Sequence, residues 1–238
     1  MLPESLKTRP QALLLDAGDT ILFMDYSALA AALAGLGEHV AVGQLERAMP
    51  LAKSAYQTVV REKAQHEHGW FVLVRSLLLE AGIPPGRAEG LLAPLRAIHE
   101  DFYFWRSVPP ELPAALGRAR EAGIRLGVVS NSEGRLQSVF ERISVLHWFE
   151  VVVDSHLEGV AKPDPRIFQI ALERMGNIAP ENAIYAGDLP EIDLTGANAA
   201  GMHAALVDTL DNYKARPDLP RVKSVAQLIN ELLALPIA

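Results

Sequence analysis

The 238-residue chain contains no cysteine, and this absence removes several classes of site. Disulfide bridges, thiolate zinc sites and cysteine nucleophiles all need a thiol, so none of them is open to this protein. Basic residues are also in the minority, because 22 Lys and Arg stand against 29 Asp and Glu, for a net charge of −7. Nucleic acids and membrane surfaces are usually bound by a basic face. We therefore expect no nucleic-acid partner and no membrane partner.

Long apolar runs are lacking as well. No stretch approaches the ~20 apolar residues that a membrane-spanning helix needs. The opening MLPESLKTRPQ does not have the charged-then-apolar pattern of a secretory signal. Half of the residues are nevertheless hydrophobic and 21% are charged, which is enough apolar surface to bury a full core. These features favour a folded, cytoplasmic protein.

Short apolar runs bounded by Gly, Asp or Asn alternate with helical patterns. Such runs are typical of buried parallel strands, and here they are residues 12–16, 124–130, 149–155, 182–188 and 203–208. Helical spacing of apolar residues occurs at 110–123, 132–143, 164–176 and 224–235. Asp164 is a candidate N-cap, and Gly123 and Gly176 are candidate helix ends. The alternation predicts a doubly wound, Rossmann-like α/β sheet.

One long segment breaks this alternation. Residues 24–108 show helical patterns without a convincing strand, and Pro50 should start or kink one of these helices. An insert of this length is too long for a loop. We therefore predict an α/β core domain of residues 1–23 and 109–238, with an all-helical cap domain of residues 24–108. The cap histidines, His66, His68 and His99, are expected to be ordinary surface residues.

The chemistry-bearing residues of the core follow the predicted strands. In an open parallel sheet, ligands bind at the carboxyl ends of the strands. Polar side chains expected there are Asp16, Ser130, Asn131, Lys162 and Asp188. Carboxylate oxygens suit Mg²⁺, while serine and lysine suit phosphate oxygens. A carboxylate can also attack phosphorus and form an aspartyl phosphate.

Four segments in order along the chain carry a resemblance to a known family. They are LLLDAGDTI, VVSNS, GVAKPDPRIF and AGDLPEIDLTGANAAGM. Together with the helical insert after the first strand, they resemble the haloacid dehalogenase (HAD) superfamily of hydrolases with a helical (C1-type) cap. The resemblance covers nearly all of the predicted core. It implies a phosphatase-like enzyme whose cap closes over the site and selects the substrate.

Carried over by position, the resemblance implies that Asp16 is the nucleophile. Ser130 and Asn131 would bind the transferring phosphoryl group, with backbone amides of the same turn. Lys162 would neutralise charge on the nucleophile and on the phosphate, in a catalytic and a binding role. A competing interpretation is that Ser130 and Asn131 cap the following helix, where both residue types are favoured.

The resemblance also implies a Mg²⁺ site. Asp16 and Asp188 would bind the ion through their carboxylates and Gly18 through its backbone carbonyl. Asp193 occupies the second acidic position of the fourth motif, where it would ligate the ion or orient metal-bound water. Asp193 could equally cap the helix that starts near it, and both interpretations stay open.

One position departs from the family pattern. Phosphatases of this family usually carry a second aspartate two residues after the nucleophile, as the acid and base of the reaction. Here that position is Gly18, and the aspartate is Asp19, one residue later. In an extended segment, side chains at i+2 and i+3 point in opposite directions. We therefore favour a turn role for Asp19 over a catalytic one, although a glycine-permitted irregular turn would allow catalysis.

Several outcomes follow from the missing acid, whose loss typically costs ~10²–10⁴ in rate. The enzyme would use Asp19, a cap residue or water as proton carrier, or it would prefer acyl or aryl phosphates. Alternatively it would be a feeble or inactive binder of phosphate ligands. A haloacid dehalogenase is disfavoured because those enzymes lack the metal-binding aspartate found here at Asp188. Phosphonate cleavage needs a reactive cap lysine, and neither Lys53 nor Lys63 shows a signal for it.

The expectation is thus a Mg²⁺-dependent hydrolase of a small phosphomonoester, acting through an aspartyl phosphate at Asp16. Its partner would be a small phosphorylated metabolite. The protein itself would be a monomer or a homodimer.

Overall fold

A computed structural model describes residues 2–63 and 69–237 of the chain. The prediction made for His66 and His68 therefore falls outside the described residues. The chain divides into two compact units, one formed by Met1–Phe23 with Val108–Ala238 and the other by Met24–Ser107. Each unit is described by itself.

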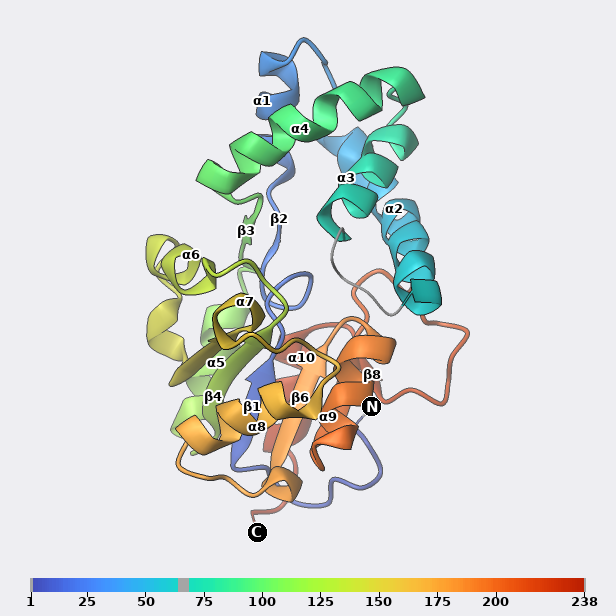
Figure 1. The fold of residues 1–238 in the computed structure, drawn as a ribbon. Helices are drawn as coiled ribbons and strands as arrows, with labels where there is room; N and C mark the ends of the chain where they lie inside the picture. Colours follow the sequence, from blue (N-terminus) through green and yellow to red (C-terminus); the bar gives the residue numbers. More distant parts are fainter. Residues whose placement is uncertain (1, 64–68, 238) are drawn as a thin grey trace. The chain divides into compact units, whose positions relative to one another are not determined.

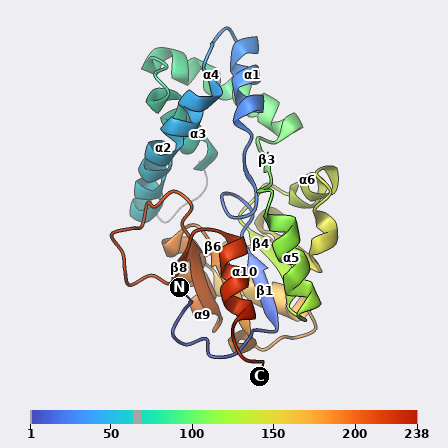
Figure 2. The ribbon, with the colours of Figure 1, turned by 180° about the vertical axis from the view of Figure 1, so that it is seen from behind.

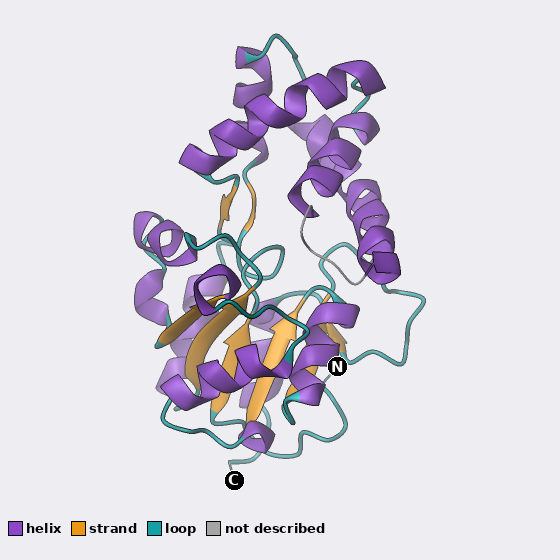
Figure 3. Ribbon diagram, viewed as in Figure 1, coloured by secondary structure: helices purple, strands orange, loops and turns teal. Residues whose placement is uncertain are grey.

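The first unit is an α/β unit built on a parallel sheet (Figures 1 and 3). The sheet order is β5-β4-β1-β6-β7-β8 in the described residues. The strands are β1 (Ala12–Leu15), β4 (Arg125–Ser130), β5 (Val151–Asp154), β6 (Ala183–Gly187), β7 (His203–Val207) and β8 (Arg221–Val222). The predicted α/β fold class is therefore confirmed. The two-residue strand β8 was not predicted.

Strand β1 lies at the centre of this sheet and is buried along its whole length. Its last residue, Leu15, is in register with Val128 of β4 on one side and Ala186 of β6 on the other. The strand order reverses here, since the chain runs from β1 outward through β4 and β5 and then returns to β6. Such a switch point forms the ligand crevice of open parallel sheets.

Helices cover both faces of the sheet. Helices α8 and α9 lie on the face seen in Figure 1, and α5 and α10 lie on the face seen in Figure 2. The helical elements of this unit are α5 (Leu112–Glu121), α6 (Leu136–Arg142), η1 (Leu146–Trp148), α7 (Ser155–Glu158), α8 (Pro165–Arg174), η2 (Pro180–Asn182), η3 (Pro190–Leu194), α9 (Thr195–Ala199) and α10 (Val225–Leu233).

Helix α8 shows why these segments form where they do. Asp164 accepts a hydrogen bond from the backbone N–H of Arg166 and caps the helix, as predicted. Ile167, Phe168 and Leu172 occupy its apolar face, are buried and pack into the core. Gly176 follows the helix with φ +82°, a left-handed conformation that glycine adopts without steric cost.

The second unit is helical apart from a short two-stranded ribbon (Figure 3). Its elements are β2 (Phe23–Met24), α1 (Tyr26–Gly35), α2 (Val42–Lys63), α3 (Gly69–Glu80), α4 (Pro85–Phe102) and β3 (Trp105–Ser107). The β2–β3 pairing was not predicted. Pro50 lies inside α2 and does not start it. Asp25 caps α1 by accepting from the Ala28 N–H at 2.9 Å, and it forms a 3.0 Å ion pair with Arg106.

The surface placement predicted for His99 is wrong. Its side chain is buried, and its Nδ1 accepts the backbone N–H of Phe104 at 3.1 Å. The imidazole stacks on Tyr103, with ring centroids 4.8 Å apart, and lies 5.4 Å from the ring of Trp70. His99 is therefore a core residue of the helical unit, because its aromatic neighbours enclose it. Lys53 is likewise buried.

Among residues 2–63 and 69–237, every helix is too short or too polar to cross a membrane.

Candidate active site

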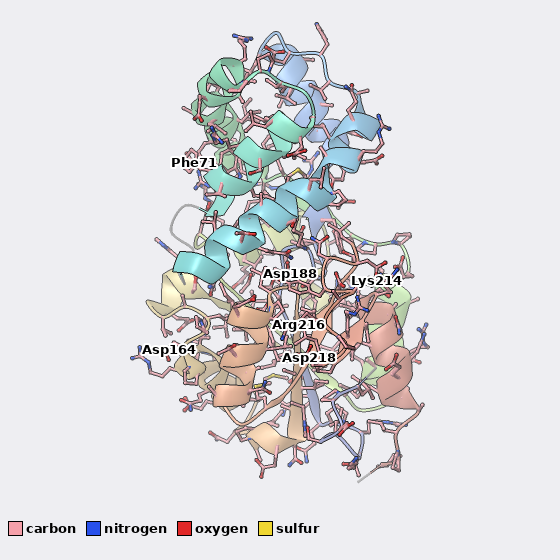
Figure 4. The ribbon with its side chains drawn as sticks, turned by 90° about the vertical axis from the view of Figure 1, so that its right-hand side faces the viewer. Phe71, Asp164, Asp188, Lys214, Arg216 and Asp218 are labelled. Atoms are coloured by element: carbon pink, nitrogen blue, oxygen red, sulfur yellow. The ribbon has the colours of Figure 1, made fainter. Side chains whose placement is uncertain are left out.

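The site is built at the carboxyl edge of the sheet, around Asp16. The Asp16 backbone N–H donates to the carbonyl of Ala186 at 2.8 Å, so the residue is fixed as the chain leaves β1. Ser130 ends the neighbouring strand β4, and Asp188, labelled in Figure 4, directly follows β6. All three side chains are buried. The switch point of the sheet therefore gathers residues that are far apart in sequence.

Three carboxylates form a cluster there. Asp16, Asp188 and Asp193 each offer an oxygen, and these oxygens lie within 4.8 Å of one another. Burial raises the pKa of Asp16, and the charge on Asp193 raises it further, while the Lys162 ammonium acts in the opposite direction. Like charges this close repel one another in a buried site, so the cluster requires a compensating cation.

Lys162 supplies part of that compensation. Its Nζ lies 2.7 Å from an oxygen of Asp16 and 2.7 Å from an oxygen of Asp193. The side chain is buried, which alone would lower its pKa, but the two carboxylates outweigh burial and hold the pKa above the usual value. Lys162 is therefore a permanent cation at this site.

Asp193 is held by two N–H donors and lies beside a hydroxyl. One oxygen accepts from Lys162, and Tyr185 lies 3.2 Å from the same atom, while the other accepts the Leu189 N–H at 2.8 Å. The residue belongs to η3, a π-helical turn, and α9 begins beyond it with Leu194 as its N-cap. The interpretation of Asp193 as a helix cap is therefore wrong.

Gly187 makes room for this carboxylate. A Cβ at Gly187 would lie 2.3 Å from Cγ of Asp193 and 2.8 Å from its Cβ, which is far inside contact distance. The glycine before Asp188 is thus explained by close approach, because any side chain there would displace Asp193.

Asn131 uses its side chain on the protein backbone. Its amide oxygen accepts the Lys162 N–H at 2.8 Å, and its amide nitrogen donates to the Lys162 carbonyl at 2.9 Å. Helix α6 begins at Leu136 with Arg135 as its N-cap, so neither Ser130 nor Asn131 caps it. Hydrogen bonding from Ser130 acts to lower the pKa of Asp16. Contact of either residue with phosphate stays a prediction.

Asp19 has the backbone conformation of a turn residue. Its φ is +53°, in the left-handed region that aspartate tolerates better than most residues, and its N–H donates to the Leu22 carbonyl at 2.7 Å. The described acidic cluster of Asp16, Asp188 and Asp193 does not include it. This geometry supports the turn role, and a catalytic role for Asp19 stays a prediction.

Two residues of the site were missed by sequence reasoning. Tyr185, inside β6, places its hydroxyl 2.7 Å from Nζ of Lys162. Burial, with the charges of Asp193 and Asp16, raises the pKa of Tyr185 well above its usual value, so the hydroxyl is neutral. Asp154, at the end of β5, accepts the backbone N–H groups of Gly134 and Leu136 and so braces the loop after β4. Asp154 could have been identified from the sequence as a polar residue near the end of a predicted strand.

A surface cavity of about 430 Å³ lies elsewhere on the same unit. Residues of η3, including Glu191, line it together with Arg216 and Asp218, which form an ion pair. Both of these charged residues are labelled in Figure 4. None of the three clustered carboxylates lines this cavity. We therefore place the candidate site at the carboxylates and not at the cavity.

Comparisons with known proteins agree with this geometry. Residues 10–201 match the model of the haloacid dehalogenase-like hydrolase family. The chain is 37% identical over 154 residues to a phosphoserine phosphatase of Thermus thermophilus, covering 61% of this chain and 58% of that one. It is 35% identical over 147 residues to a glyceraldehyde 3-phosphate phosphatase of Methanopyrus kandleri, covering 61% of each. The match spans less than two thirds of the length of these relatives.

A solved structure shows the same fold. It is that of a HAD hydrolase from Bacillus subtilis bound to magnesium, with a TM-score of 0.66 and 18% identity, covering 94% of this chain and 99% of that one. The sheet order, the convergence of residues at the end of β1 and the family match lead to one assignment. The chain belongs to the haloacid dehalogenase-like hydrolase family.

Proposed function

We propose that this protein is a Mg²⁺-dependent hydrolase of a small phosphomonoester and that it acts through an aspartyl phosphate at Asp16. The observation that carries the proposal is the buried carboxylate of Asp16, held 2.7 Å from the Lys162 ammonium beside two further carboxylates. The phosphatase names of the two relatives support the reaction class.

The residues present fit Mg²⁺. The ion takes oxygen ligands at ~2.1 Å in an octahedron, so two of its ligands lie at most ~4.2 Å apart. The three carboxylates each offer an oxygen of the kind that Mg²⁺ prefers, and these oxygens lie within 4.8 Å of one another, so ligands at the upper end of this range would draw together around the ion. Asp16 and Asp188 would hold the ion, with the Gly18 carbonyl, while the donors around Asp193 favour an orienting role for that residue. Bound there, Mg²⁺ would supply positive charge to the phosphoryl oxygens.

The chain's own residues would then carry the transfer. An Asp16 oxygen would attack phosphorus, forming the aspartyl phosphate as the bond to the leaving oxygen breaks. Lys162 would hold the nucleophile in place and balance its charge. The Ser130 hydroxyl and the N–H groups of its loop would donate to the phosphoryl oxygens. Water would then hydrolyse the acyl phosphate and regenerate Asp16.

No group is positioned for proton transfer by the motif pattern, because Gly18 has no carboxyl group and Asp19 has the backbone conformation of a turn residue. An alkoxide leaving group needs a proton, whereas the aryloxide of an aryl phosphate or the carboxylate of an acyl phosphate leaves readily without one. We therefore propose that water protonates the leaving group and that turnover favours substrates with good leaving groups.

The test is phosphate release by the purified protein with Mg²⁺ across a panel that includes phosphoserine, glyceraldehyde 3-phosphate and an aryl phosphate. The proposal expects turnover that needs Mg²⁺, is highest for the aryl phosphate and is lost in Asp16→Asn. Phosphate binding by calorimetry without turnover would instead indicate a binding protein. Halide release without metal would indicate a dehalogenase.

A further inference from the structure

Tyr185 brings a hydroxyl into the site from the middle of a buried strand. Its side chain is fully buried, and its ring packs edge-on against Phe168 with centroids 4.9 Å apart. The hydroxyl lies 2.7 Å from Nζ of Lys162 and 2.9 Å from the Val129 carbonyl. The tyrosine therefore links strands β6 and β4 to the lysine at the centre of the site.

The donors of Lys162 can be counted. An ammonium group has three N–H donors and no acceptor. Three acceptors surround it at 2.7 Å each, an Asp16 oxygen, an Asp193 oxygen and the Tyr185 hydroxyl. Every N–H of Lys162 is thus used within the protein, and none remains for a substrate oxygen unless one of these bonds breaks.

The Tyr185 hydroxyl has a single hydrogen. Because the hydroxyl accepts from Lys162, that hydrogen is left for the Val129 carbonyl at 2.9 Å or for Asp193 at 3.2 Å. The shorter contact goes to a backbone carbonyl inside the sheet, which is a fixed anchor. The position of the tyrosine oxygen, and with it the third bond of Lys162, is therefore set by the sheet.

We infer that Tyr185 is a positioning residue of the active site, whose hydroxyl fixes the Lys162 ammonium against Asp16 and takes the donor that would otherwise reach the substrate. Lys162 then acts on the nucleophile and leaves the phosphoryl oxygens to Ser130 and the loop amides. The effect of Tyr185 on the rate rests on the proposed function. The hydrogen bonds between Tyr185 and Lys162 do not depend on that function.

A purely structural role for the hydroxyl makes a different prediction. A buried tyrosine needs one partner for its O–H, and the Val129 carbonyl alone would satisfy it. In that case Tyr185→Phe would lower stability without changing the chemical step. The effect of Tyr185→Phe on kcat therefore distinguishes the positioning role from the structural one.

The kinetic experiment compares Tyr185→Phe with Phe168→Leu, using an aryl phosphate and Mg²⁺. Phe168 packs on the same ring but makes no polar contact with Lys162 in the described residues. We expect kcat to fall about tenfold in Tyr185→Phe, the scale of one hydrogen bond to a charged group, with KM within about twofold. Phe168→Leu should lower Tm and keep kcat within about twofold. An unchanged kcat in Tyr185→Phe, or a rise in KM alone, overturns the inference.

A second readout does not depend on turnover. In protein labelled with ¹⁵N-lysine and supplied with Mg²⁺, a fully bonded, buried ammonium gives a slowly exchanging NH₃⁺ signal, identified by its loss in Lys162→Arg or Lys162→Met. Tyr185→Phe should shift or remove this signal, and Phe168→Leu should retain it. An unchanged signal in Tyr185→Phe overturns the inference. If the wild type turns over no phosphate ester, the proposed function fails, and this signal still decides the role of Tyr185.

Discussion

Asn131 and Lys162 are joined by two hydrogen bonds although 31 residues separate them in sequence. The Asn131 amide accepts from the Lys162 N–H at 2.8 Å and donates to the Lys162 carbonyl at 2.9 Å. The loop after β4 and the loop before α8 are thereby fixed to each other. Asn131 therefore holds the backbone of the central lysine, and its predicted contact with phosphate stays a prediction.

Asn131→Ala should remove both of these bonds. We expect the free energy of unfolding to fall by about 1–3 kcal/mol, because two backbone groups lose their partner. We also expect kcat to fall by about tenfold or more, since Lys162 loses its fixed position. Denaturant unfolding and phosphate-release kinetics measure the two effects. The matched control is Asn198→Ala on the exposed side of α9, which should change neither. Wild-type kcat in Asn131→Ala would contradict the role given to Asn131.

Gly187→Ala should displace Asp193. The added Cβ would lie 2.3 Å from Cγ of Asp193, so the carboxylate must move away from Lys162. A displacement of ~1 Å in an active site costs about 10² in rate, and we expect phosphate release to fall by at least that factor. Gly117→Ala is the control, because its Cβ would meet only Trp148 at an ordinary 3.7 Å. Equal activity in the two variants would show that activity does not depend on the position of the Asp193 carboxylate.

Gly18→Asp should restore a proton donor. Among the described glycines, Gly18 is not one of those with positive φ, so its φ does not itself exclude a side chain. A positioned acid contributes ~10²–10⁴ in rate, and we expect a gain of about tenfold or more for an alkyl phosphate and a smaller gain for an aryl phosphate. Gly18→Asn has nearly the same shape without the acid and should show no gain. If the aspartate and asparagine variants are equally active, a missing acid does not limit this enzyme.

Asp25 should make the helical unit sensitive to acid. Burial acts to raise its pKa, but the Ala28 N–H and Arg106 outweigh it and hold the pKa below the usual value. Its contribution to stability is therefore present above the unfolded-state pKa of ~3.9 and is lost as pH falls through the lower folded-state pKa. Asp25→Asn keeps a capping oxygen but loses the ion pair. Its deficit in Tm at neutral pH should shrink in acid, and a deficit independent of pH would contradict this account.

The sequence predicted the parts of the site that depend on local pattern. Asp16, Ser130 and Asp188 end or follow apolar runs, and parallel strands place their ends at one edge, so their convergence followed from topology alone. Helix α8, with its Asp164 cap and Gly176 end, followed from spacing and capping chemistry.

The remaining features depend on contacts between distant segments. Tyr185 lies within an apolar run and is indistinguishable there from a core aromatic, because its partner Lys162 is 23 residues away. The burial of His99 depends on rings brought together by two helices and a strand. Strand β8, with two residues, is too short to produce a periodic pattern. Such features require the folded chain.

The central claim is a covalent phosphoryl group on Asp16, and chemical trapping tests it most directly. Wild-type protein turning over an aryl phosphate with Mg²⁺ is quenched with borohydride, which reduces an aspartyl phosphate to homoserine. Mass spectrometry then reads the modified position. The account predicts homoserine at residue 16 and no modification in Asp16→Asn. Steady turnover with no homoserine at residue 16, or with the phosphoryl group on another side chain, would contradict it.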